Sequence, residues 1–177
     1  KLKRFMRDYS LSEYDARILV NSKKDGEFAE NCLKQYPEKD KKHMVNWLIG
    51  PLMSEANFRK IKLHETGVDI LELINLVGFV VRQELSHLCA KSVLTLMLDS
   101  KKSAQTLINE NNLLQISDTS ALEQMIIAVI QENAKSVSDF KVGKTNALMY
   151  LVGQVMKKSS GKANPKTVQE LIRRRLT

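Results

Sequence analysis

The chain has 177 residues, of which 43% are hydrophobic and 27% charged, and its formal net charge is +8. This composition is typical of a globular protein with apolar residues for one core or two small cores, and it excludes a disordered chain. The apolar runs are too short to span a bilayer and the two cysteines form no CxxC pair, so we expect a cytoplasmic protein without a membrane segment, a disulfide framework or a metal site.

The positive charge is concentrated at one end of the chain. Residues 1–134 hold 18 Lys and Arg against 18 Asp and Glu, whereas residues 135–177 hold 10 against 2. A concentrated positive field attracts polyanions, and nucleic acid is favoured because nothing marks this segment as a membrane-surface helix. The alternative is a solvated basic face that serves solubility.

Apolar residues recur at helical spacing over most of the chain, and the period-two alternation of strands is nearly absent. The sequence therefore predicts an all-α fold. Ser10, Thr66 with Asp69, and Ser103 mark helix starts before apolar runs, because side chains of these types accept the free N–H groups of a first turn. The predicted helices of the first part cover residues 10–20, 27–35, 41–56, 66–78, 83–98 and 103–112.

Local features refine three of these helices. Gly50-Pro51 should kink the third, because proline removes a backbone donor and crowds the preceding turn. Gly78 is predicted to end the fourth. In the fifth, the residues predicted to point inward are Leu85, Leu88, Cys89 and Leu96.

A connector at residues 115–119, with Asp118 as a good N-cap, separates a helical bundle (1–114) from a smaller all-helical tail subdomain (115–177). In the tail, a new helix carries the apolar face from Leu122 to Ile130. A short helix follows and ends at Gly143. A longer one covers residues 144–157, with Leu148, Leu151, Val152 and Val155 on one side. Asn164 then caps the last helix, with Pro165 at its first position, where a missing donor costs nothing.

The usual catalytic constellations are not recognisable in the sequence. His43, His64 and His87 are isolated and fit no metal-ligand spacing such as HExxH. Gly143-Lys144-Thr145 lacks the glycine-rich run and the preceding strand of a phosphate-binding P-loop. We therefore predict no catalytic residue and no metal ligand.

The most concentrated signal is a loop of two serines and a glycine, residues 159–161, flanked by lysines and followed by a helix start. Glycine allows backbone amides to approach an anion, a helix N-terminus favours negative charge, and serine hydroxyls can donate to phosphate. Arg173-Arg174-Arg175 could extend a phosphate track or bond the last helix carbonyls. The alternative for the loop is an ordinary turn with an Asn N-cap.

Four segments carry a resemblance to a known family: LSEYDAR from Leu11, VNWLIGPL from Val45, QISD from Gln115 and LVGQVMKKSSGKANPKTV from Leu151. The chain resembles, essentially end to end, the C-terminal helical domain and YqeY-like tail of GatB, the B subunit of the aspartyl/glutamyl-tRNA amidotransferase. The resemblance implies a protein that works with an amidase subunit and a small clamp-like subunit. That complex converts misacylated Glu-tRNA(Gln) or Asp-tRNA(Asn) to the amide form with ATP and glutamine.

The resemblance also implies that ATP and Mg belong to a catalytic cradle domain that precedes Lys1, so this chain is expected to be non-catalytic and to hold no cofactor. Its expected role is to bind the tRNA body. The carried-over tRNA contacts are Lys144, Lys157, Lys158, Gly161, Lys162, Asn164 and Lys166. Possible additional phosphate contacts are Ser159, Ser160, Arg173, Arg174 and Arg175.

Two other functions remain open at this point. The helical bundle could be a protein-interaction module with an incidental basic tail, or the chain could be a stand-alone YqeY-type protein. Motifs within residues 5–52 argue against the second, because they belong to the longer GatB protein. Salt-sensitive tRNA affinity would separate RNA binding from protein binding.

Overall fold

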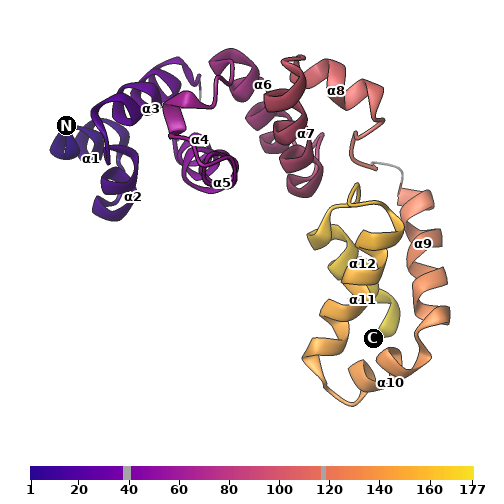
Figure 1. Cartoon of the computed structure of the whole chain (residues 1–177). Helices are drawn as coiled ribbons and strands as arrows, with labels where there is room; N and C mark the ends of the chain where they lie inside the picture. Colours follow the sequence, from indigo (N-terminus) through magenta and orange to yellow (C-terminus); the bar gives the residue numbers. More distant parts are fainter. Residues whose placement is uncertain (38–40, 117–118) are drawn as a thin grey trace. The chain divides into compact units, whose positions relative to one another are not determined.

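The computed structural model describes residues 1–37, 41–116 and 119–177. Within these ranges every regular element is a helix and there is no strand, which confirms the predicted all-α class (Figure 1). The elements are α1 (Leu2–Tyr9), α2 (Glu13–Leu19), α3 (Lys23–Gln35), α4 (Lys42–Trp47), the π-helical turn η1 (Leu48–Leu52), α5 (Met53–Phe58), the 3-10 turn η2 (Leu63–Glu65), α6 (Ile70–Val81), α7 (His87–Ser100), α8 (Ala104–Glu110), α9 (Thr119–Glu132), α10 (Ala134–Lys141), α11 (Thr145–Lys158) and α12 (Pro165–Leu176).

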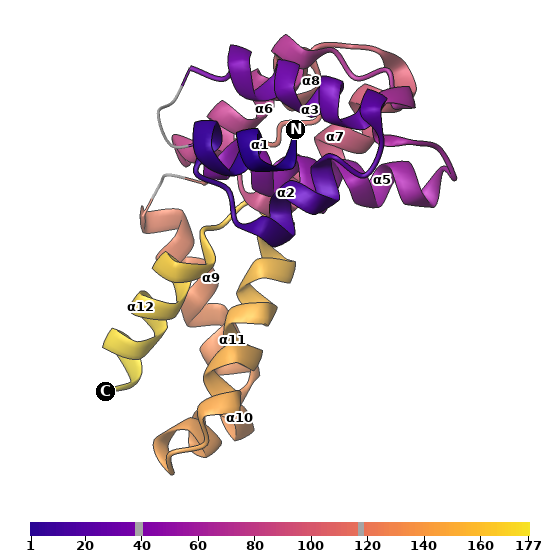
Figure 2. The ribbon, with the colours of Figure 1, turned by 90° about the vertical axis from the view of Figure 1, so that its left-hand side faces the viewer.

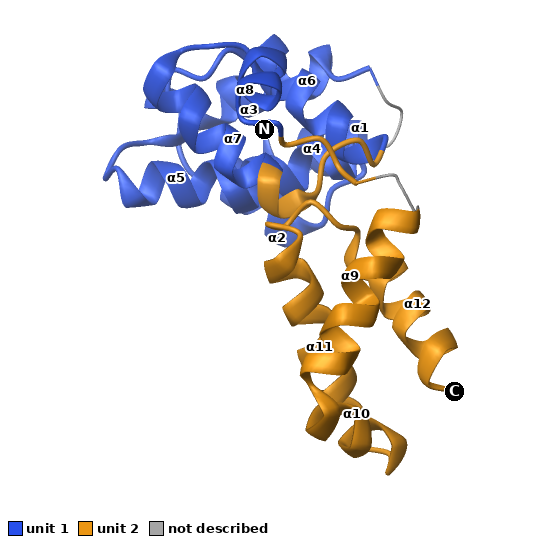
Figure 3. Cartoon of the chain, turned by 90° about the vertical axis from the view of Figure 1, so that its right-hand side faces the viewer, with its two compact units in different colours: residues 1–82, 90–112 blue, residues 83–89, 113–177 orange. Residues whose placement is uncertain are grey.

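The chain divides into two compact units, coloured separately in Figure 3. The first comprises Lys1–Arg82 and Ala90–Asn112, and the second comprises Gln83–Cys89 and Leu113–Thr177. The sequence predicts a boundary after residue 114, and the observed boundary falls after residue 112. The assignment of Gln83–Cys89 to the second unit is not predicted, because it depends on contacts between distant parts of the chain.

Helix starts in the first unit follow local capping chemistry. Asp69 and Ser103 cap α6 and α8 as predicted, each accepting a backbone N–H of the first turn. The cap of α2 is Ser12 and not the predicted Ser10, because Ser10 takes a left-handed conformation (φ 52°) and ends α1. Helix α1 itself is not predicted from the sequence. The predicted cap Asp118 lies outside the described residues.

Three further expectations about helix interiors are changed by the structure. Gly50-Pro51 lies in η1, so the predicted kink takes the form of a π-helical turn between α4 and α5. The prediction that Gly78 ends its helix is wrong, because α6 continues to Val81. The prediction that Leu88 and Leu96 point inward is also wrong, because these residues are 58% and 37% exposed.

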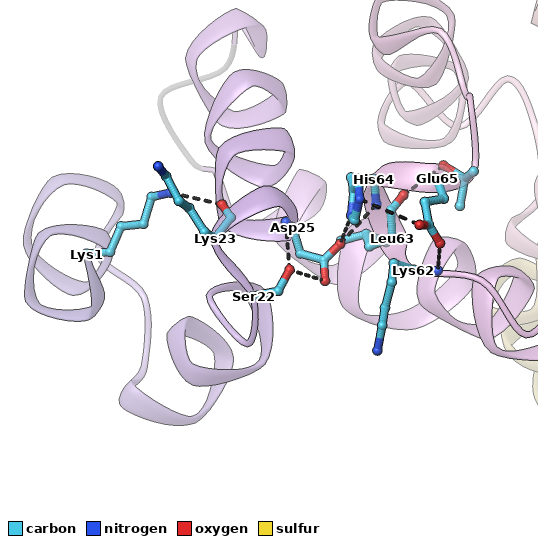
Figure 4. A network of polar contacts seen from close by, with 9 residues as sticks. Lys1, Ser22, Lys23, Asp25, Lys62, Leu63, His64 and Glu65 are labelled. Atoms are coloured by element: carbon cyan, nitrogen blue, oxygen red, sulfur yellow. Dashed lines mark hydrogen bonds and ion pairs between the residues drawn. The ribbon is translucent and has the colours of Figure 1, made fainter.

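A buried carboxylate joins the start of α3 to η2 (Figure 4). One oxygen of Asp25 accepts the backbone N–H of His64 at 3.0 Å and lies 2.7 Å from its Nδ1, and the other accepts the Ser22 hydroxyl at 2.7 Å. Burial opposes ionisation of Asp25, but the hydrogen bonds from His64 and Ser22 together outweigh it and lower its pKa. Asp25 therefore stabilises the first unit as an anion.

The second unit has its own apolar core between α9, α11 and α12, which lie side by side with α10 at one end (Figures 1 and 2). The inward residues recur at three and four along each helix, as predicted for α9 and α11. They are Leu122, Ile126, Val129, Leu148, Leu151, Val152, Val155, Val168 and Ile172, and Ala163 of the loop before α12 completes the core. This spacing leaves the intervening charged residues on the outside.

We expect Asp25→Ala to lower the free energy of unfolding by about 1–3 kcal/mol at neutral pH, because the His64 N–H loses its acceptor. The folded-state pKa of Asp25 is lowered, so its stabilisation is present above the ordinary aspartate pKa of about 4 and is lost as pH falls below that value. Urea unfolding of both proteins across this range measures the difference. A difference that stayed constant down to low pH would contradict the assignment to the Asp25 anion.

Candidate nucleic-acid interface

The basic residues of the second unit lie on the outside of the α9, α11 and α12 bundle. Because the apolar residues of α11 and α12 turn inward at helical spacing, the lysines and arginines between them face solvent. Of the ten Lys and Arg in residues 135–177, nine are exposed and Lys162 is partly exposed. The predicted basic surface is therefore accessible.

Two of the predicted lysines are held by carboxylates of the same unit. Lys158 pairs with Glu132 of α9 at 2.5 Å, and Lys144 pairs with Asp139 of α10 at 2.8 Å. The side-chain hydrogen bond from Lys144 lowers the pKa of the Asp139 carboxyl. Exposed ion pairs of this kind contribute little, so these lysines can exchange a carboxylate for another anion at small cost. Neither pairing is predicted from the sequence.

Three other predicted lysines have no ion-pair partner within the described ranges: Lys157 at the end of α11, Lys162 in the following loop and Lys166 in the first turn of α12. They lie on both sides of the same inter-helix loop. No Asp or Glu occurs between Asp139 and Glu170, a stretch that contains six lysines. This is therefore the part of the sequence where positive charge is least compensated.

The loop at residues 159–163 does not offer its backbone amides to an anion, in contrast to the phosphate cradle expected from the sequence. Each amide already has an acceptor within the second unit. The N–H groups of Ser159, Ser160, Gly161 and Lys162 donate to the carbonyls of Val155, Lys157, Met156 and Ser159 at 2.9, 3.1, 2.8 and 3.0 Å, and that of Ala163 donates to Ser159 Oγ at 3.4 Å. A phosphate at this place would have to be bound by side chains.

The two serines of the loop differ in accessibility. Ser159 is 4% exposed, and its hydroxyl donates to the Met156 carbonyl at 3.1 Å. Its predicted role as a surface phosphate donor is therefore not supported by its position. Ser160 is exposed and takes a left-handed conformation (φ 52°) at the end of α11.

Gly161 is buried and packs against a segment far away in the sequence. Its φ is +76°, and a Cβ atom on it would lie 2.8 Å from Cδ2 of Leu88. Its carbonyl accepts the hydroxyl of Ser86 at 2.5 Å. The glycine is thus required by packing within the second unit, and this role accounts for it without a bound anion.

The last helix begins as predicted, and two of its three arginines line one hollow. Asn164 Oδ1 accepts the N–H groups of Lys166 and Thr167 at 2.9 and 3.4 Å, and Pro165 occupies the first helical position. Arg174 and Arg175 line a hollow with Glu123, Ile126 and Leu171, on the side of α9. Arg173 does not line this hollow.

Other kinds of site are less well supported in the part of the chain that the structure describes. Asp25 and His64 are adjacent, but both carboxylate oxygens are used by internal donors, which fits a structural contact. Among the residues searched, no group of three or more His, Cys, Asp or Glu could hold a metal ion. None of the described helices is long and apolar enough to cross a membrane.

These features define an all-helical protein whose second unit presents a lysine-rich surface. The family model described as the GatB domain matches residues 27–176, and the chain belongs to that family. It is 38% identical over its whole length to the B subunit of aspartyl/glutamyl-tRNA(Asn/Gln) amidotransferase from Caldanaerobacter subterraneus subsp. tengcongensis. It is 39% identical to the protein of the same name from Janthinobacterium sp. over 98% of the chain. The chain spans 37% of the length of each of these relatives.

We expect Gly161→Ala to destabilise the second unit by about 1–3 kcal/mol, because the added methyl group overlaps Leu88 and alanine is strained at positive φ. Chemical denaturation followed by circular dichroism measures the loss. Adding Leu88→Ala to this variant removes the overlap but not the backbone strain, so it should recover part of the stability lost. Equal stability of wild type and Gly161→Ala would show that this packing constraint is absent.

Proposed function

We propose that this chain binds tRNA and serves as the tRNA-gripping part of the B subunit of a tRNA-dependent amidotransferase. The observation that carries the proposal is the stretch between Asp139 and Glu170, which has six exposed or partly exposed lysines and no carboxylate. Such a surface suits a polyanion, and the relatives that share its sequence are named as subunits of an enzyme acting on tRNA.

Contacts to phosphate rather than to base edges suit the groups available. The lysines are flexible point charges, and their ammonium groups bind phosphate without requiring the planar geometry of base recognition. The second unit contains two aromatic residues, and one of them, Phe140, is partly buried against the apolar core. This inventory favours recognition of the tRNA body by its shape and its backbone.

The proposal extends to the parent enzyme. There, the chain would contribute binding energy and orientation to the conversion of Glu-tRNA(Gln) or Asp-tRNA(Asn). ATP with Mg and the amide-transfer chemistry would belong to other parts of the complex, which includes an amidase subunit and a small clamp subunit. Binding the tRNA body far from the reacting end can position that end for reaction.

We expect the full chain to bind a tRNA transcript with an affinity that falls steeply between about 0.05 M and about 0.2 M salt. The variant Lys157→Gln/Lys162→Gln/Lys166→Gln should bind roughly tenfold more weakly at low salt. Its slope of log K against log salt should be shallower by about two to three, because three phosphate contacts are lost. Fluorescence anisotropy with a labelled transcript measures both quantities.

The matched control is Lys3→Gln/Lys24→Gln/Lys91→Gln, which removes the same charge from exposed positions of the first unit. This control should retain most of the affinity and the slope. Equal losses in both triple variants would indicate non-specific attraction to net charge. Salt-independent binding, or no binding by the wild type, would contradict the proposed function and favour a protein-interaction module.

A further inference from the structure

Gly153 lies in the middle of α11 and is exposed. Glycine in a helix interior costs about 1 kcal/mol relative to alanine, because it loses more backbone freedom on folding and exposes the backbone to water. A Cβ atom at this position would meet no atom within 4 Å. Neither packing nor a positive φ within the described structure accounts for this glycine.

The other glycines of the chain differ from Gly153 in this respect. Three have positive φ angles of 62°, 91° and 76°. A built Cβ would make van der Waals contacts at 3.5 Å at Gly26 and would meet the end of the Arg82 side chain at 2.9 Å at Gly78. Gly50 also has open space around it, but it precedes Pro51, whose ring crowds the preceding residue of a helix. Gly153 therefore combines a helix interior with open space, no positive φ and no following proline, and an external cause is sought for it.

Gly153 belongs to an exposed face of α11 that is opposite to the apolar core. Asn146, Tyr150, Gly153 and Lys157 follow one another at spacings of four, three and four, so they line one side of the helix. All four are exposed, and half of the Tyr150 surface is accessible. We call these four residues the α11 track.

The charge around this face of α11 favours one kind of binding partner. α11 contains no Asp or Glu, Lys157 ends the track, and the preceding helix and turn add Lys141 and Lys144 at its other end. The one carboxylate near that end, Asp139, is paired with Lys144. A surface that is positive at both ends, with an exposed aromatic ring and bare backbone between, is complementary to a nucleic-acid strand.

We propose that the α11 track receives an RNA strand, with the sugar–phosphate backbone crossing the helix at Gly153. This inference rests on the proposed tRNA binding and specifies where on the second unit the RNA lies. The missing side chain at Gly153 lets the strand approach the helix backbone closely. Lys157 then neutralises a phosphate, and Tyr150 stacks on an unpaired base, as exposed aromatic side chains do in single-stranded RNA recognition.

The test uses the full chain and an in vitro transcribed tRNA(Gln), with Kd measured by fluorescence anisotropy at about 0.1 M salt. Gly153→Gln fills the open space and should weaken binding about tenfold, while the better helix propensity of glutamine should leave the protein at least as resistant to thermal unfolding. Ala134→Gln adds the same side chain to another exposed helix position of this unit, at the start of α10, and should leave Kd unchanged.

Tyr150 supplies the second arm of the test. Tyr150→Ala should weaken binding by about fivefold or more, because a base loses its stacking platform. Tyr150→Phe keeps the ring and should bind as the wild type does. A hydroxyl-dependent role would instead make the phenylalanine variant as weak as the alanine variant, and that outcome would contradict stacking.

The outcomes separate this inference from the function on which it rests. If the wild type binds tRNA in a salt-dependent manner but Gly153→Gln binds equally tightly, tRNA binding stands and the α11 track is overturned as its site. A protein partner on this face would give that same unchanged tRNA Kd. If the wild type shows no salt-dependent tRNA binding, both the function and the inference fail.

Discussion

Close contact between the 159–163 loop and Gln83–Cys89 is the constraint on which the second unit depends. Leu88 occupies the space where a Cβ of residue 161 would lie, and the Ser86 hydroxyl bonds the Gly161 carbonyl. The loop carbonyl of Lys162 also accepts the N–H of Ile116 at 3.1 Å, so three separate chain segments meet at this turn. Because the turn is held from inside, the lysines of α11 and α12 that flank it project from a defined scaffold. A preorganised surface of this kind loses less entropy when it binds a ligand than a mobile basic tail does.

The arrangement of carboxylates determines which side of this scaffold is positive. In the linear sequence the last 43 residues appear almost free of acid, but folding brings α9 with Glu123 and Glu132 against them. Lys158 is partly neutralised there, and Arg174 and Arg175 line a hollow that includes Glu123. Basic residues on the side of α9 are consequently the ones with a carboxylate nearby. Because the loop amides are already hydrogen-bonded within the chain, the lysine side chains must supply the attraction for an anion. This attraction weakens as the salt concentration rises.

Local chemistry could be predicted from the sequence, and long-range packing could not. Asn164, Ser103 and Asp69 cap helices as expected, because a cap needs only the next two or three residues. The inward faces of α9 and α11 also follow from spacing alone. By contrast, Asp25 and His64 are 39 residues apart, and nothing in either neighbourhood marks them as partners. The same limit applies to the contact between Gly161 and Leu88, because Leu88 comes from a different helix.

Gly153 and Gly161 illustrate how a single sequence motif can combine two physical causes. Both belong to the run from Leu151 to Val168 that carries the family resemblance. Gly161 is explained within the chain, because a side chain there would collide with Leu88 and strain the backbone. Gly153 has open space around it, a helical position and solvent exposure, and each of these features would accept alanine with a gain in stability. A residue that lowers stability without an internal reason is expected where function acts against stability, at a surface that a partner approaches closely.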